Sequence, residues 1–149
     1  MTDAATHPEP ELIARALIRH NTRLLLVREK GKSWWFLPGG HREPGEVLEE
    51  ALRRELLEEL GADARLGSLR SVIEHSYTDN GAHHYEVNFL FEVTLDDHDV
   101  ISREDHLEFG WHDMDSLPEV RPGPVVHALS ASLESGTSWY PFKLNQVDD

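Results

Sequence analysis

Residues 46–60 form the segment that most constrains how this chain can fold. No residue from Glu46 to Leu60 is glycine or proline, and the segment is rich in Glu, Leu, Arg and Ala, which favour helix. Pro44 and Gly45 form a turn before it, and Gly61 after it is a common helix stop. The sequence therefore predicts a helix over residues 46–60, held between two turns.

One face of this predicted helix changes from apolar to acidic along its length. The apolar residues that gather on one side are Val47, Leu48, Ala51, Leu52 and Leu56. At about 100° per residue, Glu55 and Glu59 fall within about 20° of Leu48 on that side, and Glu58 lies beside them. Carboxylates therefore occupy the face that should be buried.

Exposure to solvent is the ordinary explanation for helical glutamates, and it accounts for Glu49 and Glu50 on the opposite side. It accounts poorly for Glu55, Glu58 and Glu59, because like charges at this spacing repel and no cation on their face offsets them. Mg²⁺ or Mn²⁺ prefers oxygen ligands, and carboxylates at i, i+3 and i+4 point to one place. The spacing thus predicts a divalent metal site, with Mg²⁺ preferred and Mn²⁺ as the alternative.

The remaining segments predict a mixed sheet packed between helices. Extended segments are expected at residues 11–19, 23–29, 34–37, 68–77, 84–95 and 108–112, and a second helix at residues 124–133. Residues 1–10 are expected to be a flexible arm, residues 11–136 the folded domain, and residues 137–149 a C-terminal tail. The Trp139–Phe142 cluster in that tail is predicted either to serve a dimer interface or to cap the core.

Composition excludes several classes of protein. The formal charge of −14 repels nucleic acid, so long nucleic acid is not an expected partner. Cysteine is absent, which excludes thiolate zinc sites and cysteine nucleophiles and fits a cytoplasmic location. Residues 1–10 lack the pattern of a signal peptide, and no apolar run is long enough to cross a bilayer. We therefore expect a soluble protein with no membrane partner.

The segment from residue 40 to residue 62 carries a pattern that resembles the Nudix box. The matching residues are Gly40, Glu46, Arg54, Glu55, Leu56, Glu58, Glu59 and Gly61. Ala62 is the one departure, since the family usually has a larger aliphatic residue there. This difference concerns packing after the helix. The Leu37–Gly40 segment ahead of the box is also similar to the family's entry from strand to loop.

The resemblance implies an α/β (α+β) sandwich with a mixed sheet, in which the box forms loop, helix and loop. It implies that Glu55, Glu58 and Glu59 bind the metal, together with the backbone carbonyl of Gly39. Arg54 would then orient the catalytic carboxylates, and Glu46 would hold the loop or act through Arg54.

Two further roles lie outside the helix. Relatives differ in which carboxylate acts as general base. Glu104 and Glu108 are the loop candidates here, with Glu104 preferred over Glu108, and exposure of both to solvent is the alternative. Arg28, Trp35 and Gly40 are the expected substrate contacts. Adjacent strand residues face opposite sides, so at most one of Trp34 and Trp35 reaches the site, and core packing is the alternative for either ring.

The resemblance predicts a metal-dependent pyrophosphohydrolase in which water attacks a phosphorus of a diphosphate. The substrate would be a nucleoside diphosphate linked to a second group, as in nucleotide sugars, ADP-ribose or dinucleoside polyphosphates. A sensor domain that binds nucleotides without turnover is the alternative, and a scaffold that docks a basic partner is a third. The sequence leaves the substrate and the oligomeric state open, although dimers are frequent among relatives.

Overall fold

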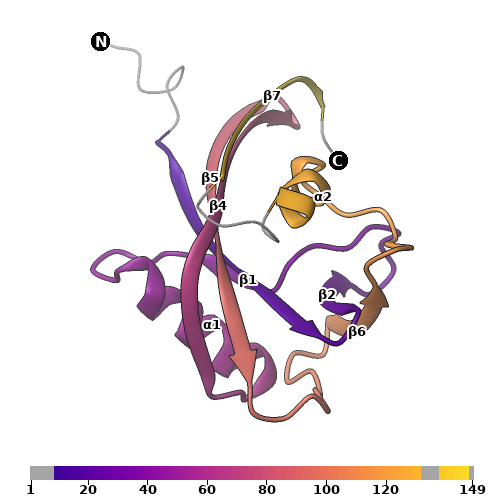
Figure 1. Cartoon of the computed structure of the whole chain (residues 1–149). Helices are drawn as coiled ribbons and strands as arrows, with labels where there is room; N and C mark the ends of the chain where they lie inside the picture. The colour runs from indigo at the N-terminus through magenta and orange to yellow at the C-terminus, as the bar shows by residue number, and fades with distance from the viewer. Residues whose placement is uncertain (1–8, 132–137, 148–149) are drawn as a thin grey trace.

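The computed structural model describes residues 9–131 and 138–147 as nine elements. The strands are β1 (Glu11–His20), β2 (Arg23–Glu29), β3 (Gly39–His41), β4 (Ala64–Asp79), β5 (Ala82–Leu95), β6 (Leu107–Asp113) and β7 (Ser138–Val147). The helices are α1 (Leu48–Leu60) and α2 (Pro124–Ala131). Both helices lie beside one strongly twisted sheet (Figure 1).

The sheet is mixed, as the sequence predicts. Its strand order is β6-β2-β1-β5-β4-β7, and β3 pairs with β1 off this path. β1 runs parallel to β5, and β4 runs parallel to β7, while the β1–β2, β1–β3, β2–β6 and β4–β5 pairs are antiparallel. The central strand β1 therefore borders both the short glycine strand β3 and the long strand β5.

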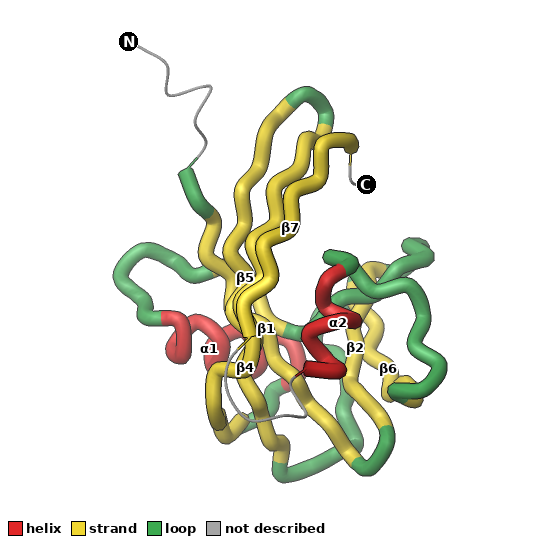
Figure 2. Tube along the Cα trace, turned by 45° about the horizontal axis from the view of Figure 1, so that its top comes forward, coloured by secondary structure: helices red, strands yellow, loops and turns green. Residues whose placement is uncertain are grey.

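Each helix covers its own apolar cluster on the sheet, and the two lie on different sides of it (Figure 2). Leu52, Leu56 and Leu60 of α1 pack with apolar residues of β1 and β5 in one cluster. Val125 and Leu129 of α2 pack with residues of β1, β4 and β5 in the other. Alternation along the strands sends neighbouring side chains to opposite faces, so one strand serves both clusters. The predicted sandwich of helix, sheet and helix is confirmed.

Most predicted elements occur close to their expected positions, and three differ. The helix begins at Leu48 instead of Glu46, so Val47 precedes it and is 61% exposed, not buried as its helical angle suggested. Residues 34–37 form only isolated bridges, at Trp35 and Phe36. Regular strand pairing begins after them, at the glycines of β3. The sequence predicts a C-terminal tail at residues 137–149, whereas Ser138–Val147 forms β7, which pairs with β4.

Helix length and hydropathy also address membrane association. Among the described residues, neither helix combines the length and the apolar character that a bilayer crossing would require.

Candidate active site

Helix α1 brings the box glutamates to the edge of the sheet at different depths. Glu59 is 9% exposed, and it is one of the few charged residues in the described core. The side chain of Glu55 is 19% exposed, and that of Glu58 is 55% exposed. Gly61 ends the helix in the left-handed conformation, which glycine adopts without steric cost. The acidic face predicted from the sequence thus runs from half-exposed to buried.

Two glycines of β3 make room for these carboxylates. A Cβ atom on Gly40 would overlap the Glu55 carboxyl group. Gly39 has a positive φ of 132°, and a Cβ there would overlap the backbone carbonyl oxygen of Ala14. The Gly39 N–H group donates a hydrogen bond to Glu59. Strand β3 can therefore approach β1 and α1 closely only because both positions are glycine.

Arg54 connects the loop of the box to its helix. Its Nε donates to Glu46 Oε2 at 2.6 Å and its Nη2 donates to Glu46 Oε1 at 3.0 Å, a bidentate pair. Its Nη1 donates to Glu55 at 3.2 Å and to Glu58 at 3.3 Å. The hydrogen bonds to Glu46 raise the pKa of Arg54, and Arg54 lowers the pKa of Glu46. One guanidinium thus fixes the positions of three carboxylates.

The electrostatics of Glu59 fit a bound cation. Burial, and after it the neighbouring Glu55 carboxylate, raise the pKa of Glu59 to about 8, against the lowering by Arg15 and the Gly39 N–H group. Glu59 Oε1 is buried with no hydrogen-bond partner among the described residues. A buried carboxylate oxygen without a partner is costly, and a hard divalent cation would satisfy it. The oxygen donors present therefore fit Mg²⁺ or Mn²⁺.

The raised pKa of Glu59 predicts that the metal-free protein loses stability as the pH rises. The carboxyl group of the unfolded chain ionises near pH 4.5, and that of the folded protein near pH 8. Between these values the folded state holds the extra proton, so the free energy of unfolding falls with increasing pH and levels off above about 8. We expect a total loss of a few kcal/mol, measured by urea unfolding in EDTA from pH 5 to 9. Glu59→Gln should flatten the curve, and an unchanged slope in that variant would contradict the prediction.

The three box glutamates do not converge fully in this conformation. Among the described residues, Glu55, Glu58 and Glu59 do not bring one oxygen each within 4.8 Å of one another. Glu58 is held by Arg54, whereas Glu55 and Glu59 are adjacent. Two of the three expected ligands are therefore in contact, and Glu58 would join them by turning away from Arg54.

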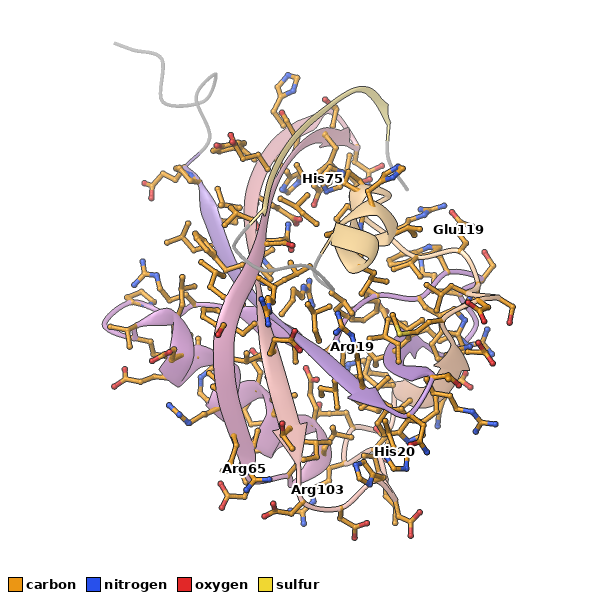
Figure 3. All side chains as sticks on the ribbon, in the orientation of Figure 1. Arg19, His20, Arg65, His75, Arg103 and Glu119 are labelled. Carbon is orange, nitrogen blue, oxygen red and sulfur yellow. The ribbon has the colours of Figure 1, made fainter. Side chains whose placement is uncertain are left out.

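The loop that carries Glu104 docks on the end of the acidic helix. The Arg103 N–H group donates to the Glu59 carbonyl at 2.7 Å, and the Arg103 guanidinium lies over Gly61. Figure 3 shows Arg103 beside that end of α1. Glu104 itself exchanges two backbone hydrogen bonds with the Ser102 hydroxyl group. This arrangement holds the backbone of Glu104 next to the C-terminal end of α1.

Two predicted residues occupy a different place from the one expected. Arg28 pairs with Glu108 at 3.0 Å on adjacent strands, and its guanidinium lies 4.5 Å from the centroid of the Trp35 ring. Trp35 is 8% exposed and belongs to the apolar cluster under α2. Core packing, the stated alternative for Trp35, is therefore what the structure shows, and a contact of this ring with the substrate stays a prediction. Arg28 likewise contacts Trp35 and Glu108, and it does not line the pocket described next.

A pocket of about 410 Å³ opens on the α2 side of the sheet. Its aromatic residues are Trp34, Phe36 and Tyr77, its cations Arg15, Lys32 and Arg121, and its acids Glu29, Asp79 and Glu86. His75, near α2 in Figure 3, also lines it. Burial alone would raise the pKa of Glu86, but His75, Arg15 and Tyr77 outweigh it and leave that pKa below its ordinary value. Trp34, and not Trp35, thus lines this pocket.

Arg15 is one of the pocket residues that were not predicted from the sequence, and the one for which the sequence carries a signal. A signal was present, because Ile13, Arg15 and Leu17 share one face of a strand and both neighbours are fully buried. A charged residue inside such a period-two apolar pattern is uncommon and marks a site.

A second group of metal-binding residue types lies apart from the three glutamates Glu55, Glu58 and Glu59. Glu11, His41 and Glu86 each place one ligand atom within 4.8 Å of the others. His41 and His84 contact Glu11 at 2.9 and 3.0 Å, and Tyr77 donates to Glu86 at 3.1 Å. These contacts account for the group without an ion.

The fold and the glutamate helix define the class of protein. Residues 10–129 match the family model described as the NUDIX domain, so the chain belongs to the Nudix family. It is similar to the ADP-ribose pyrophosphatase of Methanocaldococcus jannaschii, with 29% identity over 74% of this chain and 66% of that protein. It is also similar to the nucleoside triphosphatase NudI of Enterobacter sp., with 32% identity over 56% of this chain and 64% of that protein.

Solved structures agree on the fold. The MutT protein of Bacillus halodurans superposes with a TM-score of 0.74 at 20% identity, over 89% of each chain. Identity at this level shows the fold alone. The chain spans 56 to 66% of the length of three curated relatives that it matches.

Proposed function

We propose that the chain is a pyrophosphohydrolase that uses Mg²⁺, with Mn²⁺ as a substitute, to cleave the diphosphate linkage of a small nucleotide substrate. The observation that carries this proposal is the pair of half-buried Glu55 and buried Glu59, which lies against two glycines that allow no side chain. Two adjacent carboxylates, one of them with an unpaired buried oxygen, cost stability in a metal-free protein. Selection for binding a cation explains why such a cost persists.

This proposal gives a chemical task to Glu46, Arg54, Glu55, Glu58 and Glu59 of the box. Glu55, Glu58 and Glu59, with the Gly39 carbonyl, would hold the metal, which when bound offsets phosphate charge and lowers the pKa of water. Arg54, braced by Glu46, keeps Glu55 and Glu58 in place. The Gly39 N–H group orients Glu59. Glu104 remains our proposed general base, because its loop is hydrogen-bonded to Glu59 through Arg103.

The pocket supports a nucleoside diphosphate derivative as substrate. Trp34, Phe36 and Tyr77 offer aromatic faces for a base, and its volume is in the range of small-molecule sites. Two relatives are named as an ADP-ribose pyrophosphatase and a nucleoside triphosphatase. We therefore place ADP-ribose, nucleotide sugars, dinucleoside polyphosphates and nucleoside triphosphates first among the substrates to test.

A nucleotide sensor without turnover is the second candidate. A protein that only binds nucleotides gains nothing from a buried pair of repelling carboxylates. A scaffold that docks a basic partner is weaker still, because only Glu58 among the three box glutamates is substantially exposed.

A nucleotide panel with and without Mg²⁺ tests these alternatives. Nucleoside monophosphate should appear by anion-exchange chromatography only with Mg²⁺ or Mn²⁺, and Glu58→Gln should lower kcat about 10²-fold, since part of the metal's stabilisation of charge is lost. Glu49→Gln is the matched control on the exposed side of α1 and should keep the parent rate. Binding of nucleotide without product would support the sensor and contradict the enzyme. If neither nucleotide binding nor product is detected, the scaffold is the candidate that remains.

A further inference from the structure

Arg15 is a half-buried cation that the box chemistry does not use. Its Nη1 donates to the Leu37 carbonyl at 3.0 Å, and its Nε lies 3.5 Å from Asn88 Oδ1. Burial lowers the pKa of Arg15, against the charges of Glu86, Glu59 and Glu55, although arginine stays protonated in proteins. Both hydrogen-bond partners are neutral groups.

Arg15 lacks the partner that a buried arginine usually has. Within the described residues, no carboxylate oxygen lies within 4.0 Å of its guanidinium. A half-buried cation with neutral partners only is unfavourable, unless an anion joins it at another stage. A guanidinium has five N–H groups in a planar fork that matches two phosphate oxygens. Arg15 therefore has the charge and the donors to bind a phosphate.

Arg15 also lies where the two halves of the site meet. It is paired in register with Gly39, whose N–H group binds Glu59. Its guanidinium lines the pocket and lies 5.5 Å from the centroid of the Phe36 ring, near the Trp34 wall. Arg15 therefore lines the pocket and also interacts with the charges of Glu55 and Glu59 on α1.

We propose that Arg15 binds a phosphate group of the substrate where the diphosphate passes from the glutamates into the pocket. The inference rests on the proposed function for the identity of the ligand as a diphosphate. It assigns Arg15 to substrate binding and leaves metal binding to the carboxylates.

The test measures binding of α,β-methylene-ADP, whose bridging carbon prevents hydrolysis, by calorimetry in Mg²⁺. Arg15→Gln should weaken this binding about 10- to 100-fold, the usual effect of lost hydrogen bonds to a charged group. Arg15→Lys should weaken it several-fold, because lysine keeps the charge without the fork. Arg19→Gln, on the same strand and paired with Glu92, is the control and should match the parent.

Mg²⁺ titration separates substrate binding from a purely structural role. Removing a cation near Glu55 and Glu59 should leave Mg²⁺ affinity unchanged or make it tighter, so weaker Mg²⁺ binding with unchanged analogue affinity would overturn the proposal. Failure of the parent to bind the analogue, or affinity within twofold of the parent in both variants, would overturn it as well. Thermal melts check folding, and Arg15→Lys keeps the test valid if Arg15→Gln does not fold.

Steady-state kinetics distinguish this inference from the proposed function. With a hydrolysed substrate, Arg15→Gln should raise KM by at least tenfold and lower kcat less than it raises KM. Hydrolysis by the parent with KM unchanged in the variant would overturn the role of Arg15 and leave the activity standing. The parent could instead bind the analogue in a way that depends on Arg15 and yet form no product. That result would support the phosphate-binding role of Arg15 and overturn the proposed activity.

Discussion

Replacement of Glu59 by glutamine is expected to lower kcat roughly 10³-fold and leave the fold intact. Several kcal/mol of transition-state stabilisation are at stake if Glu59 holds the metal, and each 1.4 kcal/mol corresponds to a factor of ten. Glutamine has nearly the same shape, and it removes the charge that burial and Glu55 disfavour. The loss should therefore appear in the rate and not in expression or folding.

The measurement is kcat at saturating Mg²⁺ on the best substrate of the panel, with Glu49→Gln as the control on the exposed side of α1. Thermal unfolding in EDTA at pH 8 should show the Glu59→Gln protein to be at least as stable as the parent. A rate within tenfold of the parent would contradict the role of Glu59 as a metal ligand.

These two results together would separate a functional carboxylate from a structural one. Removing a charge that pairs within the fold destabilises a protein, as expected for either partner of a buried ion pair. Removing a charge that is unfavourable in the metal-free folded state should stabilise the protein, while the activity disappears. Glu59 is expected to follow the second pattern, whereas Arg54, which binds Glu46 through two hydrogen bonds, should follow the first.

Local signals in the sequence account for the parts of the fold that were predicted well. Helix α1 ends at Gly61 because glycine adopts the left-handed conformation found there. The β4–β5 hairpin turns at Asn80 and Gly81, both with positive φ, as expected for an Asn-Gly turn. The acidic stripe follows from helical geometry alone. Each of these features is decided within a few residues.

The less accurate predictions concern contacts between distant residues. Alternation along a strand separates Trp34 from Trp35, but only the tertiary arrangement decides which of them faces the pocket. Arg28 pairs with Glu108 through the β2–β6 register, which their own sequences do not specify. The parallel pairing of β7 with β4 is equally non-local.

Replacement of Gly39 by alanine is the second change with a large expected effect, and it should act on the fold. The backbone of Gly39 has a φ of 132°, which strains any residue with a side chain, and the new Cβ would overlap the backbone oxygen of Ala14. Ala14 is fully buried in the central strand β1, so that oxygen cannot move away cheaply. We expect a loss of about 3 kcal/mol or more, measured by urea unfolding.

Two control variants divide this loss into its causes. Gly31→Ala combines a positive φ with open space, so it should show backbone strain of about 1 kcal/mol and no more. Gly123→Ala has neither a positive φ nor a close neighbour, and it should be nearly neutral. If Gly39→Ala lost no more than Gly31→Ala, the close approach of β3 to β1 would be wrong. The contact between the Glu59 carboxylate and the Gly39 N–H group would then be wrong as well, because both contacts depend on the close approach of β3.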